Sequence, residues 1–80
     1  MMYQLKEDID LKDLFNGVRK CNSDVFFKTK EGDNLNLKSE LSHYVLMIVA
    51  NNKDFLLRGH IECVDETDYT LLTDYITYKE

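Results

Sequence analysis

The sequence predicts a small α/β (α+β) domain, an open-faced β-sandwich in which three helices cover one side of a four-stranded sheet. Segments with an apolar residue at every second position alternate with segments whose apolar residues follow helical spacing. The chain has 80 residues, no proline and three glycines, and no stretch resembles a linker. We therefore expect one domain over residues 1–80, with the order strand, helix, strand, strand, helix, strand, helix.

The first two elements are a short strand and an amphipathic helix. Tyr3 and Leu5 alternate with polar neighbours, which is typical of a strand with one buried face. Asp10 is a suitable N-cap for the helix, which should end near residues 21–23. The apolar stripe of this helix consists of Leu11, Leu14, Phe15 and Val18.

Residues 24–29 and 35–37 form the next two strands. The first is rich in β-branched and aromatic side chains, and residues 30–33 follow it as a hairpin loop in which Gly32 allows a positive φ. Leu35 and Leu37 alternate with polar residues in the second. The pattern predicts a hairpin with one buried face.

Ser39 is the expected N-cap of the second helix, which ends near residues 51–53. The apolar residues of this helix again follow helical spacing. They would cover the sheet, and they are Leu41, Tyr44, Val45 and Ile48. His43 then lies on a face beside this stripe.

A fourth, half-exposed strand is expected over residues 55–64. Phe55, Leu57, Gly59, Ile61 and Cys63 would share its inner face. Asp65 then opens the last helix, because acidic residues in the first turn suit the helix dipole. The inner stripe of this helix would consist of Tyr69, Leu72, Thr73 and Ile76.

Charge and hydropathy exclude several classes of function. The formal net charge of -5, without a basic stripe, argues against nucleic acid as a partner and leaves a protein or peptide. The longest apolar run, residues 44–50, is far short of the roughly 20 residues that span a bilayer. The N-terminus lacks the pattern of a secretory signal, so we expect a cytoplasmic protein with no membrane partner.

The cysteines and histidines form no recognisable chemical motif. Cys21 and Cys63 are far apart and outside any metal-binding spacing, so we interpret them as buried thiols. His43 and His60 have ordinary surface or boundary roles. We therefore expect no metal site, no cofactor and no enzymatic activity.

Two segments resemble the HPr family, the histidine phosphocarriers of the bacterial phosphotransferase system. The first, Gly32-Asp33-Asn34-Leu35-Asn36-Leu37-Lys38-Ser39, is similar to the family's segment around its regulatory serine. The second is Lys20-Cys21-Asn22-Ser23-Asp24-Val25, and the spacing between the two needs no gap. The resemblance covers nearly the whole chain and implies the same open-faced fold.

The resemblance also implies that the phosphorylated histidine is lost. In the ungapped register the family's histidine falls on Asp8, its arginine on Asp10 and its proline on Leu11. Phosphoryl transfer between carriers needs an imidazole that accepts and returns the group near neutral pH. Acids at this corner would repel an incoming phosphoryl group.

Ser39 falls on the family's regulatory phosphorylation site, although a serine there is also a good helix cap. The family's docking patch falls on Glu40, Tyr44 and Met47. Glu40 replaces the usual aliphatic residue, and Tyr44 stands where a methionine or similar residue is usual.

We therefore predict a non-catalytic HPr-like binding or regulatory module, whose partner is a protein of the phosphotransferase system or a regulator. The alternative is an active phosphocarrier that uses Asp8 as an acyl phosphate acceptor. A homodimer is left open, through an apolar stripe of Phe26, Leu56 and Val64 on the outer face of the sheet.

Overall fold

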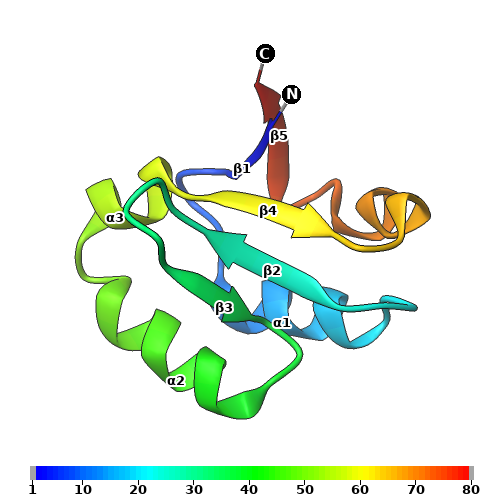
Figure 1. The fold of residues 1–80 in the computed structure, drawn as a ribbon, viewed down its shortest axis with the longest axis horizontal. Coiled ribbons are helices and arrows are strands. Elements are labelled where there is room, and N and C mark those ends of the chain that lie inside the picture. The colour runs from blue at the N-terminus through cyan, green and yellow to red at the C-terminus, as the bar shows by residue number, and fades with distance from the viewer. Residues whose placement is uncertain (1, 80) are drawn as a thin grey trace.

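The computed structural model describes residues 2–79 and shows an α+β fold with one open antiparallel sheet (Figure 1). Its strand order is β3-β2-β4-β1-β5. The strands are β1 (Met2–Leu5), β2 (Val25–Lys28), β3 (Asn34–Asn36), β4 (His60–Cys63) and β5 (Ile76–Lys79). The helices are α1 (Leu11–Arg19), α2 (Glu40–Val49), α3 (Lys53–Arg58) and the 3-10 helix η1 (Glu66–Leu72).

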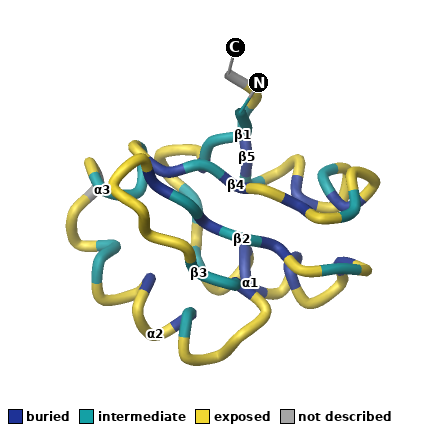
Figure 2. The backbone as a smooth tube through the Cα atoms, in the orientation of Figure 1, coloured by how far each residue is buried: buried dark blue, intermediate teal, exposed yellow. Residues whose placement is uncertain are grey.

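The two faces of the sheet differ in polarity, as strand alternation requires. Val25 and Phe27 of β2 lie opposite Cys63 and Ile61 of β4, and all four side chains are buried. The other face carries Lys28, which pairs with Glu62 at 2.6 Å and lies over the ring of Phe26. Helices therefore cover one face, and the other meets solvent (Figure 2).

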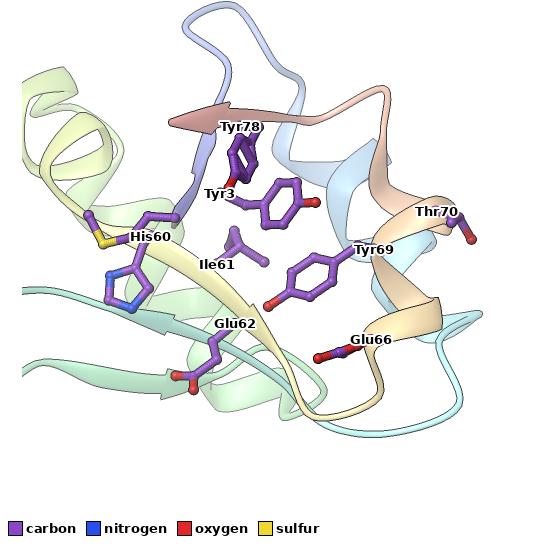
Figure 3. A pocket seen from close by; sticks show the side chains of 9 residues that line it. Tyr3, His60, Ile61, Glu62, Glu66, Tyr69, Thr70 and Tyr78 are labelled. Atoms are coloured by element: carbon purple, nitrogen blue, oxygen red, sulfur yellow. The ribbon is translucent and has the colours of Figure 1, made fainter. Parts of the chain in front are cut away.

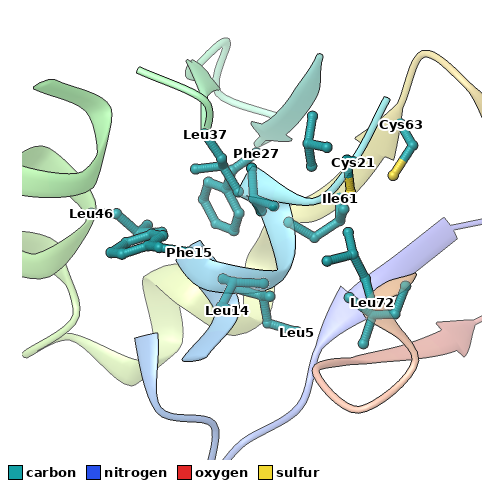
Figure 4. Packing of buried hydrophobic residues seen from close by; sticks show 13 residues of the cluster. Leu5, Leu14, Phe15, Cys21, Phe27, Leu37, Leu46, Ile61, Cys63 and Leu72 are labelled. Atoms are coloured by element: carbon teal, nitrogen blue, oxygen red, sulfur yellow. The ribbon is translucent and has the colours of Figure 1, made fainter. Parts of the chain in front are cut away.

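The core lies between the sheet and α1, whose predicted stripe and cap are confirmed. The Asp10 carboxylate accepts a hydrogen bond from the Lys12 backbone N–H at 2.9 Å. Side chains from both ends and the middle of the chain complete this core (Figure 4), and its buried hydrophobic members are Leu5, Leu14, Phe15, Val18, Cys21, Val25, Phe27, Leu37, Leu46, Ile61, Cys63, Leu72 and Ile76.

The predicted fourth strand over residues 55–64 is wrong in its first half, which forms α3. The Asn52 side chain accepts a hydrogen bond from the Phe55 backbone N–H at 3.3 Å, so the helix has an N-cap of its own. Gly59 separates α3 from β4. It is buried against the Phe27 ring so closely that a Cβ atom would overlap the ring, which favours glycine at this position.

The predicted last helix is also wrong beyond Leu72. The Asp65 side chain caps the Thr67 N–H at 2.9 Å as expected, but the helix is a short 3-10 helix. Residues 76–79 form a fifth strand, which pairs with β1 from Met2 opposite Lys79 to Leu5 opposite Ile76. The segment Tyr75-Ile76-Thr77-Tyr78 has the β-branched and aromatic composition of a strand, so the signal was present.

The β1–β5 ribbon is joined to the rest of the sheet by a narrow junction. Within residues 2–79, the ladder between β1 and β4 has one register pair, Tyr3 opposite Ile61. Next to it, the Tyr69 hydroxyl accepts a hydrogen bond from the Cys63 backbone N–H at 3.0 Å. A side chain thus takes a position on β4 that a neighbouring strand would otherwise fill.

A buried carboxylate attaches η1 to the turn between α1 and β2. Asp68 has no exposed surface, and it accepts hydrogen bonds from the backbone N–H groups of Asn22 at 2.9 Å and Ser23 at 3.0 Å. These bonds connect segments more than forty residues apart in the sequence. Asp68 therefore fixes the position of η1 against the core.

Candidate interaction surface

Helix α2 is held against the domain by a narrow inner face. The His43 ring is buried and stacks on Phe15 of α1, with 3.8 Å between ring centroids and 5° between planes. Its Nε2 atom is in hydrogen-bonding contact with the carbonyl oxygen of Leu37. Leu46 is fully buried, and Val49 packs beside it at the edge of the core.

The predicted orientation of α2 is therefore wrong. The side chains expected to cover the sheet face solvent instead, with exposed fractions of 72% for Leu41, 65% for Tyr44, 38% for Val45 and 73% for Ile48. His43, expected beside this stripe, lies on the inner face. We call Leu41, Tyr44, Val45 and Ile48 the α2 stripe.

The reason for the inversion lies in the composition of α2, which is apolar on both sides. Its ten residues, ELSHYVLMIV, include one acidic residue, Glu40, and one imidazole ring, His43. A helix that is hydrophobic all round is normally buried on all sides. Here α2 lies along the outer side of the domain, and most of its length is exposed (Figure 2).

The residues that the family resemblance placed in a docking patch lie on or beside the α2 stripe. Glu40, Tyr44 and Met47 are all exposed, so the structure brings them together on the outward side of one helix. Ser39 occupies the N-cap position, but its side chain makes no capping hydrogen bond. Its exposed hydroxyl thus lies at the end of this surface without the capping role that its position suggested.

The predicted phosphate corner is an acidic depression at the start of α1. Asp8 and Asp10 line it together with Glu7, Asp13 and Asp74. Asp8 is exposed, whereas the Asp10 carboxylate caps the helix. Lys6 is the only basic side chain that lines the depression. The net negative charge of the depression therefore repels anions.

A second concavity, of about 560 Å³, opens where the β1–β5 ribbon diverges from β4 (Figure 3). Three tyrosine rings line it. Tyr3 stacks on Tyr69 at 4.3 Å between centroids and meets Tyr78 edge to face at 5.2 Å. Burial raises the pKa of Tyr69, which uses its hydroxyl to accept the bond from β4.

The two acids at this concavity differ in their surroundings. Glu62 lies on its rim but is already paired with Lys28, and Glu66 is exposed at the start of η1. His60 belongs to the outward face of β4, as predicted. The rings thus serve to join two parts of the sheet, and we assign no ligand to the concavity.

The described residues offer few reactive groups. Cys21 and Cys63 are free and buried, as predicted, and burial raises the pKa of both thiols, that of Cys63 to about 12. Within residues 2–79 no group of three or more histidine, cysteine or acidic side chains is arranged to hold a metal ion. In the same range no helix is long and apolar enough to cross a bilayer.

The predicted dimer stripe of Phe26, Leu56 and Val64 does not form as a continuous sheet surface. Leu56 lies on α3, where it is half-buried and packs against the core. Val64 follows β4 and is exposed, whereas Phe26 lies under the Lys28 ammonium. The extended apolar surface is on α2 instead.

Known proteins add no family assignment. The chain matches no protein family model, no curated protein and no solved structure.

Proposed function

We propose that this chain is a non-catalytic, HPr-like protein-binding or regulatory module, and that the α2 stripe is its binding face. One observation carries the proposal: a helix that is apolar all round is anchored by a narrow inner face, while Leu41, Tyr44 and Ile48 project into solvent. Burying each of these side chains contributes roughly 1.5–3 kcal/mol, so a protein surface that covers α2 gains binding energy.

The relation to HPr is part of this proposal and depends on the sequence motifs. The segment ending in Lys38-Ser39 leads directly into α2, and the three docking positions Glu40, Tyr44 and Met47 lie on its exposed side. A family that docks its partners through this helix would retain a docking surface at the same place after the phosphorylated histidine is lost, with its chemistry changed at Glu40 and Tyr44.

The chemistry of the acidic corner supports a role without phosphoryl transfer. Asp8 and Asp10 stand where the family has histidine and arginine, and Asp10 is already used as a helix cap. A phosphoryl group brought to this corner would meet several carboxylates and one ammonium group. Like charges disfavour both the approach of the group and an acyl phosphate on Asp8.

The binding face is tested with a charge-neutral double variant. Leu41→Glu and Ile48→Lys together remove two exposed apolar groups, and each charge suits the dipole at its end of α2, so the fold should persist. Val64→Lys with Leu71→Glu is the matched control, because both residues are exposed and apolar but lie outside α2. When they are immobilised, the wild-type and control chains should each retain a partner protein. The immobilised α2 variant should not retain it.

A protein retained in this way is then purified and titrated against all three chains. We expect at least about tenfold weaker binding to the α2 variant than to the wild type and control, because central apolar anchors dominate protein interfaces. Equal binding to wild type and α2 variant would refute α2 as the binding face.

The non-catalytic assignment has its own test. The chain is incubated with labelled phosphoenolpyruvate and the first enzyme of the phosphotransferase system, with an authentic HPr as the positive control. We expect no label on this chain. Label that disappears in Asp8→Asn would establish the phosphocarrier instead.

A further inference from the structure

We infer that the α2 stripe binds the α2 stripe of a second copy of this chain, as an antiparallel pair of helices related by a two-fold axis. This inference rests on the proposed binding role of α2 and names the occupant of that surface. It follows from the spacing of the stripe, the distribution of charge on α2 and the area that the surface exposes.

The spacing of the stripe is self-complementary. In an antiparallel pair centred between Tyr44 and Val45, Leu41 of one copy lies opposite Ile48 of the other, and Tyr44 lies opposite Val45. Every position of the stripe is then matched by an apolar partner of the same stripe. A two-fold interface requires this reciprocity, because the same surface must serve both copies.

Charge favours the antiparallel orientation. The only acidic residue of α2 is Glu40, at its first position, and no lysine or arginine lies within the helix. A parallel pair would bring two Glu40 carboxylates together. The antiparallel pair separates them to opposite ends of the interface. The helix dipoles also oppose each other favourably.

The exposed area is sufficient for a specific but weak dimer. The four side chains of the α2 stripe, with Met47 beside them, are 38–73% exposed and form one apolar group on α2. The largest apolar patch of a monomer usually measures roughly 300–600 Å². Two facing patches of this usual size bury on the order of 1,000 Å² together, which is near the lower limit for a specific interface. We therefore expect dissociation in the micromolar range rather than a permanent dimer.

A lipid surface fits α2 less well than a second copy. Interfacial helices usually carry lysine and arginine on the face beside their apolar stripe, which attract anionic lipid. The interior of α2 has neither residue, and the chain carries a net charge of -5. The neutral stripe allows two acidic chains to meet without bringing like charges into the interface.

Sedimentation velocity over a micromolar concentration series tests the pair. We expect the wild type and the Val64→Lys/Leu71→Glu control to shift from one to two chain masses, and the Leu41→Glu/Ile48→Lys variant to associate at least about tenfold more weakly. Circular dichroism and thermal melting verify that all three chains are folded. A wild type that is monomeric at every concentration would overturn the inference.

Engineered cysteines test the orientation. In the antiparallel pair, position 41 lies opposite position 48 of the partner, whereas the two copies of position 41 are about 10 Å apart along the axis, too far for a disulfide. A mixture of Leu41→Cys and Ile48→Cys chains should therefore cross-link faster than either alone. Wild type is the control, because its own thiols are buried. Preferential linking of Leu41→Cys to itself would reject the orientation.

The outcomes also separate this inference from the proposed function. The wild type could remain monomeric while a purified partner binds it and not the α2 variant. In that case the inference of a second copy is wrong, and the binding role of α2 stands. If the wild type dimerises and the α2 variant dimerises equally, the pair forms elsewhere and the inference fails. Stripe-dependent binding to anionic vesicles would assign the surface to lipid instead.

Discussion

At the scale of single residues, Asp68 is the polar side chain on which the fold depends most. Its carboxylate is fully buried and accepts two backbone N–H groups from the turn after α1. A small domain has little stability to spare. The loss of one buried acceptor that serves two donors therefore removes a large fraction of the total free energy of unfolding.

We expect Asp68→Ala to lower the free energy of unfolding by roughly 1–3 kcal/mol, because the backbone N–H groups of Asn22 and Ser23 lose their acceptor. Asp74→Ala is the control, since this acid is exposed, and it should change stability by less than about 0.5 kcal/mol. Urea denaturation of both variants measures the difference. An Asp68→Ala chain as stable as the control would show that water replaces the carboxylate.

The buried thiols predict how stability responds to alkali. Burial, with the negative charges of nearby groups, raises the pKa of Cys63 from its ordinary 9.0 to about 12. The folded state therefore holds this proton more tightly than the unfolded state. This contribution is fully present below about pH 9 and is lost as the pH rises towards 12.

Denaturation at increasing alkaline pH should accordingly show a steeper loss of stability in the wild type than in Cys63→Ala. The variant will be less stable overall, because a small core side chain is truncated, but its pH slope above pH 9 should be shallower. Parallel slopes for the two chains would show that Cys63 does not ionise on unfolding in this range.

At the scale of elements, α2 shows what the sequence could and could not predict. Helical spacing located the helix and its N-terminus at Ser39 correctly. It did not identify the inner face, because Leu41, Tyr44, Val45 and Ile48 form one apolar stripe while His43, Leu46 and Val49 form another. A histidine reads as polar in such a pattern, yet its ring stacks on Phe15 and acts as a core side chain.

The same limit applies to the two other errors. Residues 53–58 contain the apolar run Phe55-Leu56-Leu57, which fits a strand or a helix, and the local cap at Asn52 selects the helix. Residues 76–79 continue a helical spacing from η1, but their aromatic and β-branched side chains pair with β1. A local cap thus decided the first case and tertiary pairing the second, whereas the stronger pattern of α1 needed no such decision.

His43 should therefore control whether α2 remains attached. We expect His43→Ala to remove the stack on Phe15 and to cost roughly 2–4 kcal/mol, with α2 affected before the sheet. His43→Phe, which keeps an aromatic ring but loses the contact with the Leu37 carbonyl, should cost less. Hydrogen exchange resolved by residue measures this: α2 amides should lose protection in His43→Ala while β2 and β4 amides retain it.

At the scale of the whole molecule, the helices and the polar outer sheet face divide the surface by chemistry. The open face of the sheet carries charged pairs, the start of α1 carries acids, and α2 carries the largest apolar group of exposed side chains. The resemblance to HPr predicted a phosphate corner at the start of α1 and a docking patch within residues 39–47. The solvent-facing orientation of the whole helix became visible only in three dimensions, since it depends on which stripe the core accepts.

The narrow junction between the β1–β5 ribbon and β4 divides the sheet into two parts, which are the ribbon and the three strands β3, β2 and β4. A single register pair and the Tyr69 hydroxyl connect them within residues 2–79, whereas β1 and β5 are paired along their full length. We expect the ribbon to open as a flap about Tyr3 and Ile61 only when Leu5 of β1 and Ile76 of β5 leave the core, because both side chains are buried there. Native-state exchange would detect such a flap as a separate cooperative unit, and Tyr69→Phe, which lacks the hydroxyl, should open it more often.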